Sequence, residues 1–381
     1  MKRLEIVDQG VLYRNPHPGH RAICAFLANV VPLGDDEILC FYRLGQAFYS
    51  HDGRLARLRS SDGGRSWNEE GLVWDPRNDP APRTYAAPHA TRLADGTLVL
   101  VAHRYPSDDQ DLLRFNPKTG GARPTEAVLF RSADGGRSWS APEVLNLGSG
   151  PMIDTPSSIL ELGDGRWFLA CEVWKGWDDP RPLHIKGYGL FSADGGRTWG
   201  DRVDFPSASD PARMYSHSRY TRMLDGRICV LQWTQSIGGQ QNFDLHFVVS
   251  DRSGREWSVP QPTGIQAQTS WVADLGDGNL AAAYTAREGM RPGVMVAASG
   301  DGGRSWDLER QVIVWDAVGQ EFLGVTHKPT YPSSHDNIAF GKPNLARLPG
   351  GDLIASWWCT QACVTHIRYA RLAVTEPGVS S

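Results

Sequence analysis

The chain has 381 residues and carries 39 Lys and Arg against 43 Asp and Glu, which gives a formal net charge of −4 at pH 7. A small negative charge gives no reason to expect a nucleic-acid partner, and no apolar run reaches the roughly 18 residues that a membrane-spanning helix needs. The opening residues MKRLEIVDQG lack the apolar core of a secretory signal peptide, so we expect a cytoplasmic protein.

Taken in chain order, the first recurring element is an apolar run, a tight Gly- or Asp-containing turn and a second apolar run. It occurs six times, at 28–43, 90–104, 158–174, 220–233, 271–284 and 344–358. Two β-rich runs around a Gly-containing turn predict a β-hairpin, and helical periodicity is almost absent. The sequence therefore predicts an all-β protein built on six hairpins.

A second element is repeated out of phase with the hairpins. Its four full copies are SSDGGRSW at 60–67, SADGGRSW at 132–139, SADGGRTW at 192–199 and SGDGGRSW at 299–306. A degenerate copy, SDRSGREW at 250–257, has Arg252 where the others have Asp. The paired glycines supply positive φ, the Asp can bond backbone amides across the bend, and the Trp can pack between neighbouring sheets. We interpret these segments as scaffold turns.

The pattern S-x-D-G-G-x-[ST]-W at this spacing resembles the Asp-box, or BNR, repeat of the sialidase (neuraminidase) superfamily. The resemblance extends from about Ala25 to Ala373 and implies a six-bladed β-propeller of four-stranded antiparallel blades with Asp-box turns. The last blade ends soon after 366–374 and would be one strand short. We expect residues 3–14 to supply that strand, so that 1–381 form one closed domain.

The two faces of such a propeller carry different loops. The hairpin turns and the Asp-boxes share one face, whereas long irregular segments at 68–89, 104–126, 172–188 and 316–342 belong to the other. Long loops on a rigid scaffold are usually functional, and these contain many His, Tyr, Trp, Arg and Asp residues. Aromatic faces with polar groups beside them suit sugar binding, so we expect the site at the axis on this face.

The resemblance also implies a catalytic set, which we transfer residue by residue. The family's acid/base Asp corresponds to Asp52 in the loop GQAFYSHDG. The family's Glu, which partners a Tyr nucleophile, falls near His217 in RMYSHSRY, and Tyr331 is the nearest residue to the nucleophile itself.

The same resemblance implies three arginines that bind a substrate carboxylate. Arg287 or Arg291 in AREGMRPG matches one of them, and Arg21 lies near the place of another. The second strand of the fourth hairpin ends in LQWTQ and holds no Arg. The triad is incomplete, which argues against sialic acid itself as the substrate.

Alignment of the hairpins on their turns gives a second set of candidates without reference to any family. Seven residues after the turn, the second strands hold Arg43, His103, Glu172, Trp233, Thr285 and Trp358. The starts of the inner strands add His89, Asp154, Tyr215, His217 and Lys342. Apolar scaffold positions would not vary in this way, so we expect these side chains to converge on the axis.

Glu172 is the strongest carboxylate candidate, because burial beside Trp174 would raise its pKa as a general acid requires. A salt bridge to Arg43, Lys175 or Lys342 is an equal alternative. Glycoside cleavage commonly needs a second carboxyl group. The sequence does not choose among Asp52, Asp108, Asp154, Asp178 and Asp244.

Three functions remain open. The leading hypothesis is an exo-acting glycoside hydrolase that releases a terminal sugar, either neutral or acidic. The alternatives are a propeller that binds a glycan or a protein without chemistry, and a polysaccharide lyase in which His217 or His89 acts with a Tyr beside a uronic carboxylate. The candidate catalytic residues are Glu172, Asp52, His217 and Tyr215. The candidate substrate-binding residues are Arg21, Arg43, His89, His103, Asp154, Trp174, Trp233, Arg287, Arg291 and Lys342. No metal or cofactor motif is present, and we expect neither.

Overall fold

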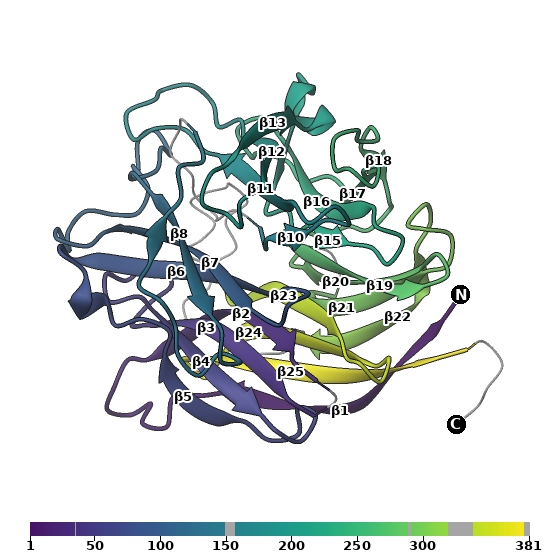
Figure 1. The fold of residues 1–381 in the computed structure, drawn as a ribbon, viewed down its shortest axis with the longest axis horizontal. Coiled ribbons are helices and arrows are strands. Elements are labelled where there is room, and N and C mark those ends of the chain that lie inside the picture. Colours follow the sequence, from purple (N-terminus) through teal and green to yellow (C-terminus); the bar gives the residue numbers. More distant parts are fainter. Residues whose placement is uncertain (35, 149–156, 289–290, 319–337, 377–381) are drawn as a thin grey trace.

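The computed structural model describes residues 1–381 except 35, 149–156, 289–290, 319–337 and 377–381. Six antiparallel sheets follow one another around a central axis (Figure 1). The predicted six-bladed β-propeller is therefore confirmed. Each of the six predicted hairpins forms the two inner strands of one blade, because each second strand pairs with the first across a tight turn.

Blades 1 to 3 each contain four strands in chain order. Blade 1 contains β2 (Cys24–Pro32), β3 (Ile38–Gly45), β4 (Arg54–Ser60) and β5 (Asn68–Leu72). Blade 2 contains β6 (Arg83–Arg92), β7 (Leu98–Pro106), β8 (Glu126–Ser132) and β9 (Glu143–Val144). Blade 3 contains β10 (Leu160–Glu161), β11 (Trp167–Val173), β12 (Lys186–Ser192) and β13 (Gly200–Asp204).

Blade 5 also has four strands in chain order, whereas the inner strand of blade 4 is in two pieces and the outer strand of blade 6 comes from the start of the chain. Blade 4 contains β14 (Arg213–Ser216), β15 (Thr221–Arg222), β16 (Ile228–Ser236), β17 (His246–Val249) and β18 (Gln261–Pro262). Blade 5 contains β19 (Ser270–Gly276), β20 (Asn279–Ala286), β21 (Gly293–Ser299) and β22 (Asp307–Asp316). Blade 6 contains β23 (Phe340–Arg347), β24 (Leu353–Gln361), β25 (Val364–Thr375) and β1 (Arg3–Tyr13). Two 3-10 turns, Pro76–Asn78 and Pro206–Ser209, lie in links between blades.

Blade 6 is completed from the other end of the chain. β1 runs antiparallel along β25, from the pair Arg3 and Thr375 to the pair Tyr13 and Ile367. The Tyr369 hydroxyl donates to Asp8 at 2.8 Å across this pairing. The segment 3–14 thus takes the position expected for the closing strand, and β25 is left with no open edge.

The middle strands form the hydrophobic core because neighbouring sheets pack against both of their faces. All five residues of Leu98–Ala102 in β7 are fully buried, so the alternation typical of a half-exposed strand is absent. Cys40, Cys171, Cys229 and Cys359 lie in the corresponding second strands and are buried, free thiols. They pack as small apolar side chains.

The Asp-box turns satisfy their own polar groups locally. In the 132–139 copy, Ser132 Oγ donates to Asp134 and accepts from Gly136 N at 2.9 Å, while Asp134 accepts from Ser138 N and Ser138 Oγ. The degenerate copy preserves the turn by a shift of one residue: Asp251 accepts from the amides of Arg255 and Glu256 in place of the missing Asp at 252.

The Trp residues of the boxes pack against the preceding blade. Trp139 lies edge-on to Phe41 with ring centroids 5.3 Å apart, and Trp257 packs on Phe168 and Phe205. Trp306 contacts Phe247 in the same way. Each of these rings thus joins its own blade to the blade before it.

Candidate functional site

The innermost strands of four blades each contain a bulge at the equivalent position. Leu27, Ala87, His217 and Lys342 all have left-handed backbone, with φ of 59°, 51°, 52° and 44°. The strand register shifts between Phe26 and Asn29, between Ala86 and His89, and between Gly341 and Asn344, while β14 and β15 are interrupted at 217–220. Non-Gly residues rarely adopt this backbone, and such bulges often redirect side chains next to functional sites.

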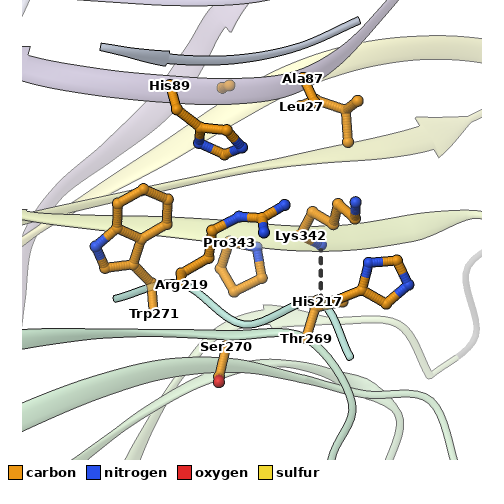
Figure 2. A pocket seen from close by; sticks show the side chains of 11 residues that line it. Leu27, Ala87, His89, His217, Arg219, Thr269, Ser270, Trp271, Lys342 and Pro343 are labelled. Carbon is orange, nitrogen blue, oxygen red and sulfur yellow. Dashed lines mark hydrogen bonds between the residues drawn. The ribbon is translucent and has the colours of Figure 1, made fainter. Parts of the chain in front are cut away.

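The bulges surround a small cavity at the axis (Figure 2). Its polar lining comes from four blades: His89 from blade 2, His217 and Arg219 from blade 4, Thr269 from the start of blade 5 and Lys342 from blade 6. Trp271, Leu27, Ala28, Ala87, Ser270 and Pro343 complete it. The enclosed space is about 20 Å³, enough for one or two water molecules or a group the size of a carboxylate, but not for a sugar ring.

The cavity is electropositive. Burial and the neighbouring Arg219 charge hold the pKa of Lys342 well below its ordinary value, and burial lowers the pKa of Arg219 to about 10. Burial, followed by the charges of Arg219 and Lys342 and by His103, holds the pKa of His89 well below 6.5. A pKa below 6.5 leaves His89 mostly neutral at pH 7, and the ring shares the cavity with the guanidinium of Arg219 and the amine of Lys342.

Glu172 lies behind this cavity and holds its wall. Its two carboxylate oxygens accept from His217 N at 2.9 Å and from Ser218 N at 2.8 Å, across the bulge of blade 4. Burial raises the pKa of Glu172, while these amides and the Arg219 charge act in the opposite direction. Glu172 is not among the residues that line the cavity. Its visible role is to position the backbone that carries His217 and Arg219.

His217 and Trp233, both predicted site residues, are brought together. Their rings stack with centroids 5.2 Å apart and 21° between planes. The Trp233 indole N–H donates to Asn242 at 2.8 Å, which fixes the ring that supports His217. His103 lies behind His89 on β7 and is buried, where burial and the charges of Arg114 and Lys342 lower its pKa well below 6.5.

Arg43 and Asp52 organise a loop rather than the cavity. The fully buried Arg43 guanidinium donates to the carbonyl oxygens of Tyr85, Ala47 and Ser50. A side chain at Gly53 would come within 2.5 Å of Arg43 Nη2, so only glycine fits there. Asp52 accepts from Gln46 N at 3.0 Å and lines a separate cleft of about 610 Å³ together with Arg54, Asp75 and Arg83.

Arg287 also has its guanidinium engaged by backbone. It donates from Nε and Nη2 to Phe340 O, at 3.0 and 2.7 Å, and lies directly over Gly341. Its pKa is lowered to about 9 by burial. Arg291 is exposed and pairs with Asp316 at 2.7 Å, while the exposed Arg21 lies in the 14–23 link.

Two other predicted residues serve neighbouring structure. The Tyr215 hydroxyl donates to Asp210 at 3.0 Å and lies 3.5 Å from His246, outside the cavity lining. The Trp174 indole donates to Gly120 O at 2.8 Å, and its ring packs on Phe115, so it joins the loop 107–125 to the loop after β11. Asp108, Asp178 and Asp244 do not line the cavity. Asp154 and Tyr331 lie outside the described residues.

The sequence reasoning missed Arg219, Trp271 and Thr269. A signal was available in the inner strands rather than in the second strands. When these strands are aligned on their turns, one position holds Asn29, His89, Ser158, Arg219, Trp271 and Asn344. Three of these six residues line the cavity.

The described part of the chain offers neither a ready metal centre nor a helical membrane span. No group of three or more His, Cys, Asp or Glu side chains is placed there to hold a metal ion. Within the same residues, no helix is long and apolar enough to cross a membrane.

Comparison with known proteins gives one relative in sequence and many in structure. No family model matches the chain. A sialidase of Micromonospora viridifaciens is 27% identical over 206 residues, which cover 48% of this chain and 31% of that protein. The match therefore spans less than a third of the relative's own length.

Three solved structures illustrate the structural likeness. A Dyadobacter fermentans protein of unknown function superposes with a TM-score of 0.72 at 18% identity, covering 97% of this chain and 99% of that one. A Hadza microbial sialidase gives 0.64 at 14% identity, over 95% and 68%. A Penicillium chrysogenum α-L-arabinanase, complexed with arabinobiose, gives 0.62 at 14% identity, over 96% and 98%. The predicted resemblance to the sialidase superfamily is thus confirmed by a sialidase relative in sequence and by a propeller fold shared with sialidases.

Proposed function

We propose that this protein is a carbohydrate-active enzyme that acts on a terminal sugar bearing a carboxylate, as an exo-acting glycoside hydrolase. The observation that carries the proposal is the axial cavity, where Arg219 and Lys342 are buried together beside His217 and His89. The Glu172 charge favours the cationic form of both groups from behind the cavity, and a ligand carboxylate inside the cavity would add a second favourable charge.

The size and chemistry of the cavity favour a carboxylate as that anion. A planar carboxylate accepts charge-assisted hydrogen bonds from a guanidinium and an ammonium at once. About 20 Å³ admits such a group while the sugar ring stays outside, among the long loops of the same face. The fold relatives named as sialidases and as an arabinanase support a glycan substrate for a propeller of this shape.

Proton transfer is the less complete part of the proposal. Glycoside hydrolysis commonly uses two carboxyl groups on either side of the scissile bond. No Asp or Glu lines the described cavity, Glu172 is bound to two backbone amides, and Asp52 lies in another cleft. Within the described residues, His217 and His89 bring imidazole side chains, a common type of general base, to this cavity.

The basic and imidazole side chains of the axial cavity also favour a lyase as a second candidate. In β-elimination a base removes the proton on the carbon next to a uronic carboxylate, the electron pair forms a double bond, and the glycosidic C–O bond breaks with its pair leaving on oxygen. Cations around the carboxylate stabilise the charge that develops, and a neutral histidine can accept the proton. The cavity contains both kinds of group.

One assay separates these functions. The purified protein is incubated with aryl glycosides of sialic acid, glucuronic acid, galacturonic acid and arabinose, and with uronate oligosaccharides. A hydrolase releases the aryl group and a saturated sugar, whereas a lyase produces an unsaturated sugar that absorbs in the ultraviolet. Binding of the acidic sugars without turnover would leave only a glycan-binding propeller, and preference for arabinosides would contradict recognition of a carboxylate.

A further inference from the structure

His89 is buried without a protein partner. Its side chain is 6% exposed, and neither Nδ1 nor Nε2 has a hydrogen-bond partner in the described part of the protein. A buried polar group left unsatisfied destabilises the fold, so native proteins rarely contain two on one ring. Figure 2 shows the ring pointing into the space bounded by Trp271, Arg219 and Lys342. The centroids of the His89 and Trp271 rings are 5.9 Å apart.

The equivalent position in other blades shows what a structural residue does there. In blade 6, Asn344 turns sideways and accepts from Val30 N of blade 1 at 2.9 Å. In blade 1, Asn29 accepts from Ala90 N of blade 2 at 2.8 Å. Both asparagines join neighbouring blades through backbone amides. His89 occupies the same register position and turns into the cavity instead.

We infer that His89 is the hydroxyl-binding residue of the axial site, where its neutral ring hydrogen-bonds a sugar hydroxyl beside the carboxylate held by Arg219 and Lys342. This inference rests on the proposed function and adds to it a group that selects the substrate. A neutral imidazole offers one N–H donor and one acceptor nitrogen, the pair that a hydroxyl complements.

The electrostatic surroundings keep the ring in the form that this role needs. The basic side chains Arg219 and Lys342 line the cavity with His89 from blades 4 and 6, and His103 lies on the same blade as His89. All three oppose a positive charge on the ring, so His89 does not compete with them for the carboxylate. Selectivity is then divided: the cations require an acid, and His89 requires a hydroxyl at the correct distance from it.

The test measures binding rather than turnover. Free glucuronate, galacturonate and N-acetylneuraminate are titrated into the wild type, His89→Asn and Asn29→Ala by calorimetry, with glucose as the uncharged control. Asn is the residue found at this position in blades 1 and 6, so His89→Asn should fold with an unchanged or higher melting temperature. We expect it to weaken binding of the preferred sugar about 10-fold or more, since one hydrogen bond to a buried polar group is lost.

The Asn29→Ala variant is the matched control at the same register position. It should lower the melting temperature and leave sugar affinity unchanged. Equal affinity of the wild type and His89→Asn would overturn the role of His89 while leaving the acidic-sugar function standing. If none of the three sugars binds the wild type, both are overturned.

A second measurement does not depend on any variant folding. In the wild type labelled with nitrogen-15 in its histidines, the His89 ring nitrogens should report a neutral ring near pH 7. Their resonances should shift when the preferred sugar is added. A cationic ring, or resonances that do not move at saturation, would overturn the inference.

Discussion

At the Asp-box end of blade 2, Asp134 accepts from Ser138 N and Ser138 Oγ, and Ser132 completes the turn. At the axial end of the same blade, His89 contacts no protein hydrogen-bond partner in the described structure. The first set of polar groups is satisfied within eight residues, whereas the second faces cations from two other blades. Polar groups that hydrogen-bond within their own turn stabilise the fold. A buried polar group at the axis that has no partner in the described protein can bind a ligand.

Of the changes that distinguish the axial site from the Asp-box end, loss of Arg219 should have the largest effect on sugar binding and turnover. Arg219→Met keeps much of the side-chain volume but removes the charge that we propose holds the substrate carboxylate. Affinity for the preferred acidic sugar, or kcat/KM on its glycoside, should fall about 100-fold or more, in line with the 2–5 kcal/mol for truncating one partner of a buried charge pair. Arg137→Met at the exposed Asp-box end is the control and should leave both quantities unchanged. Comparable losses in the two variants would contradict the axial site.

Glu172→Gln tests whether Glu172 positions the site or performs the chemistry. Both carboxylate oxygens of Glu172 accept hydrogen bonds from backbone amides. In Gln one of these oxygens is replaced by an NH2 group, which cannot accept, so one hydrogen bond is lost. The free energy of unfolding should fall by about 1–3 kcal/mol in chemical denaturation, together with sugar affinity, because His217 and Arg219 lose their support.

Glu143→Gln, next to Arg131 at the periphery, provides the comparison and should change neither quantity. If Glu172→Gln instead abolishes turnover while stability and affinity remain, Glu172 is the acid or base itself.

Stability should fall as the pH drops from 7 to 5. Because burial and neighbouring charges lower the folded-state pKa of His89, the unfolded chain binds a proton below about pH 6.5 that the folded chain does not bind. The free energy of unfolding then decreases by up to about 1.4 kcal/mol per pH unit for each such histidine. His89→Asn removes one of them, so denaturation at several pH values should show a shallower decline than in the wild type. Parallel profiles would mean that the pKa of His89 is the same in the folded and the unfolded protein.

Ser132→Ala should have the smallest effect of these changes, and only the stability of the fold should change. The hydroxyl accepts from Gly136 N and donates to Asp134, and its loss should lower the free energy of unfolding by about 1–2 kcal/mol. Turnover per folded molecule should match the wild type, since the turn lies at the other end of the blade. A drop in kcat with an unchanged melting temperature would show that the two ends are coupled.

The sequence by itself determined the Asp-box turns, the six hairpins and hence the propeller. Each is a local pattern whose hydrogen bonds close within a few residues, as Asp134 and Ser138 show. Even the degenerate copy was readable, because Ser250 and Trp257 keep the spacing of the full copies. The strand 3–14 could be placed next to blade 6 because the last hairpin had only one following strand.

The tertiary structure decided which of the predicted side chains line the axial cavity and which do not. The bulges at Leu27, Ala87, His217 and Lys342 turn the inner strands, and no local pattern announces them. Glu172 was predicted as an acid, but backbone amides from the next blade engage its carboxylate; Arg43 likewise binds carbonyls of its own loop and of β6. Arg219 was overlooked although it lines the cavity. Turns depend on neighbours in sequence, whereas the site is assembled from different blades, and its electrostatics exist only once those blades meet.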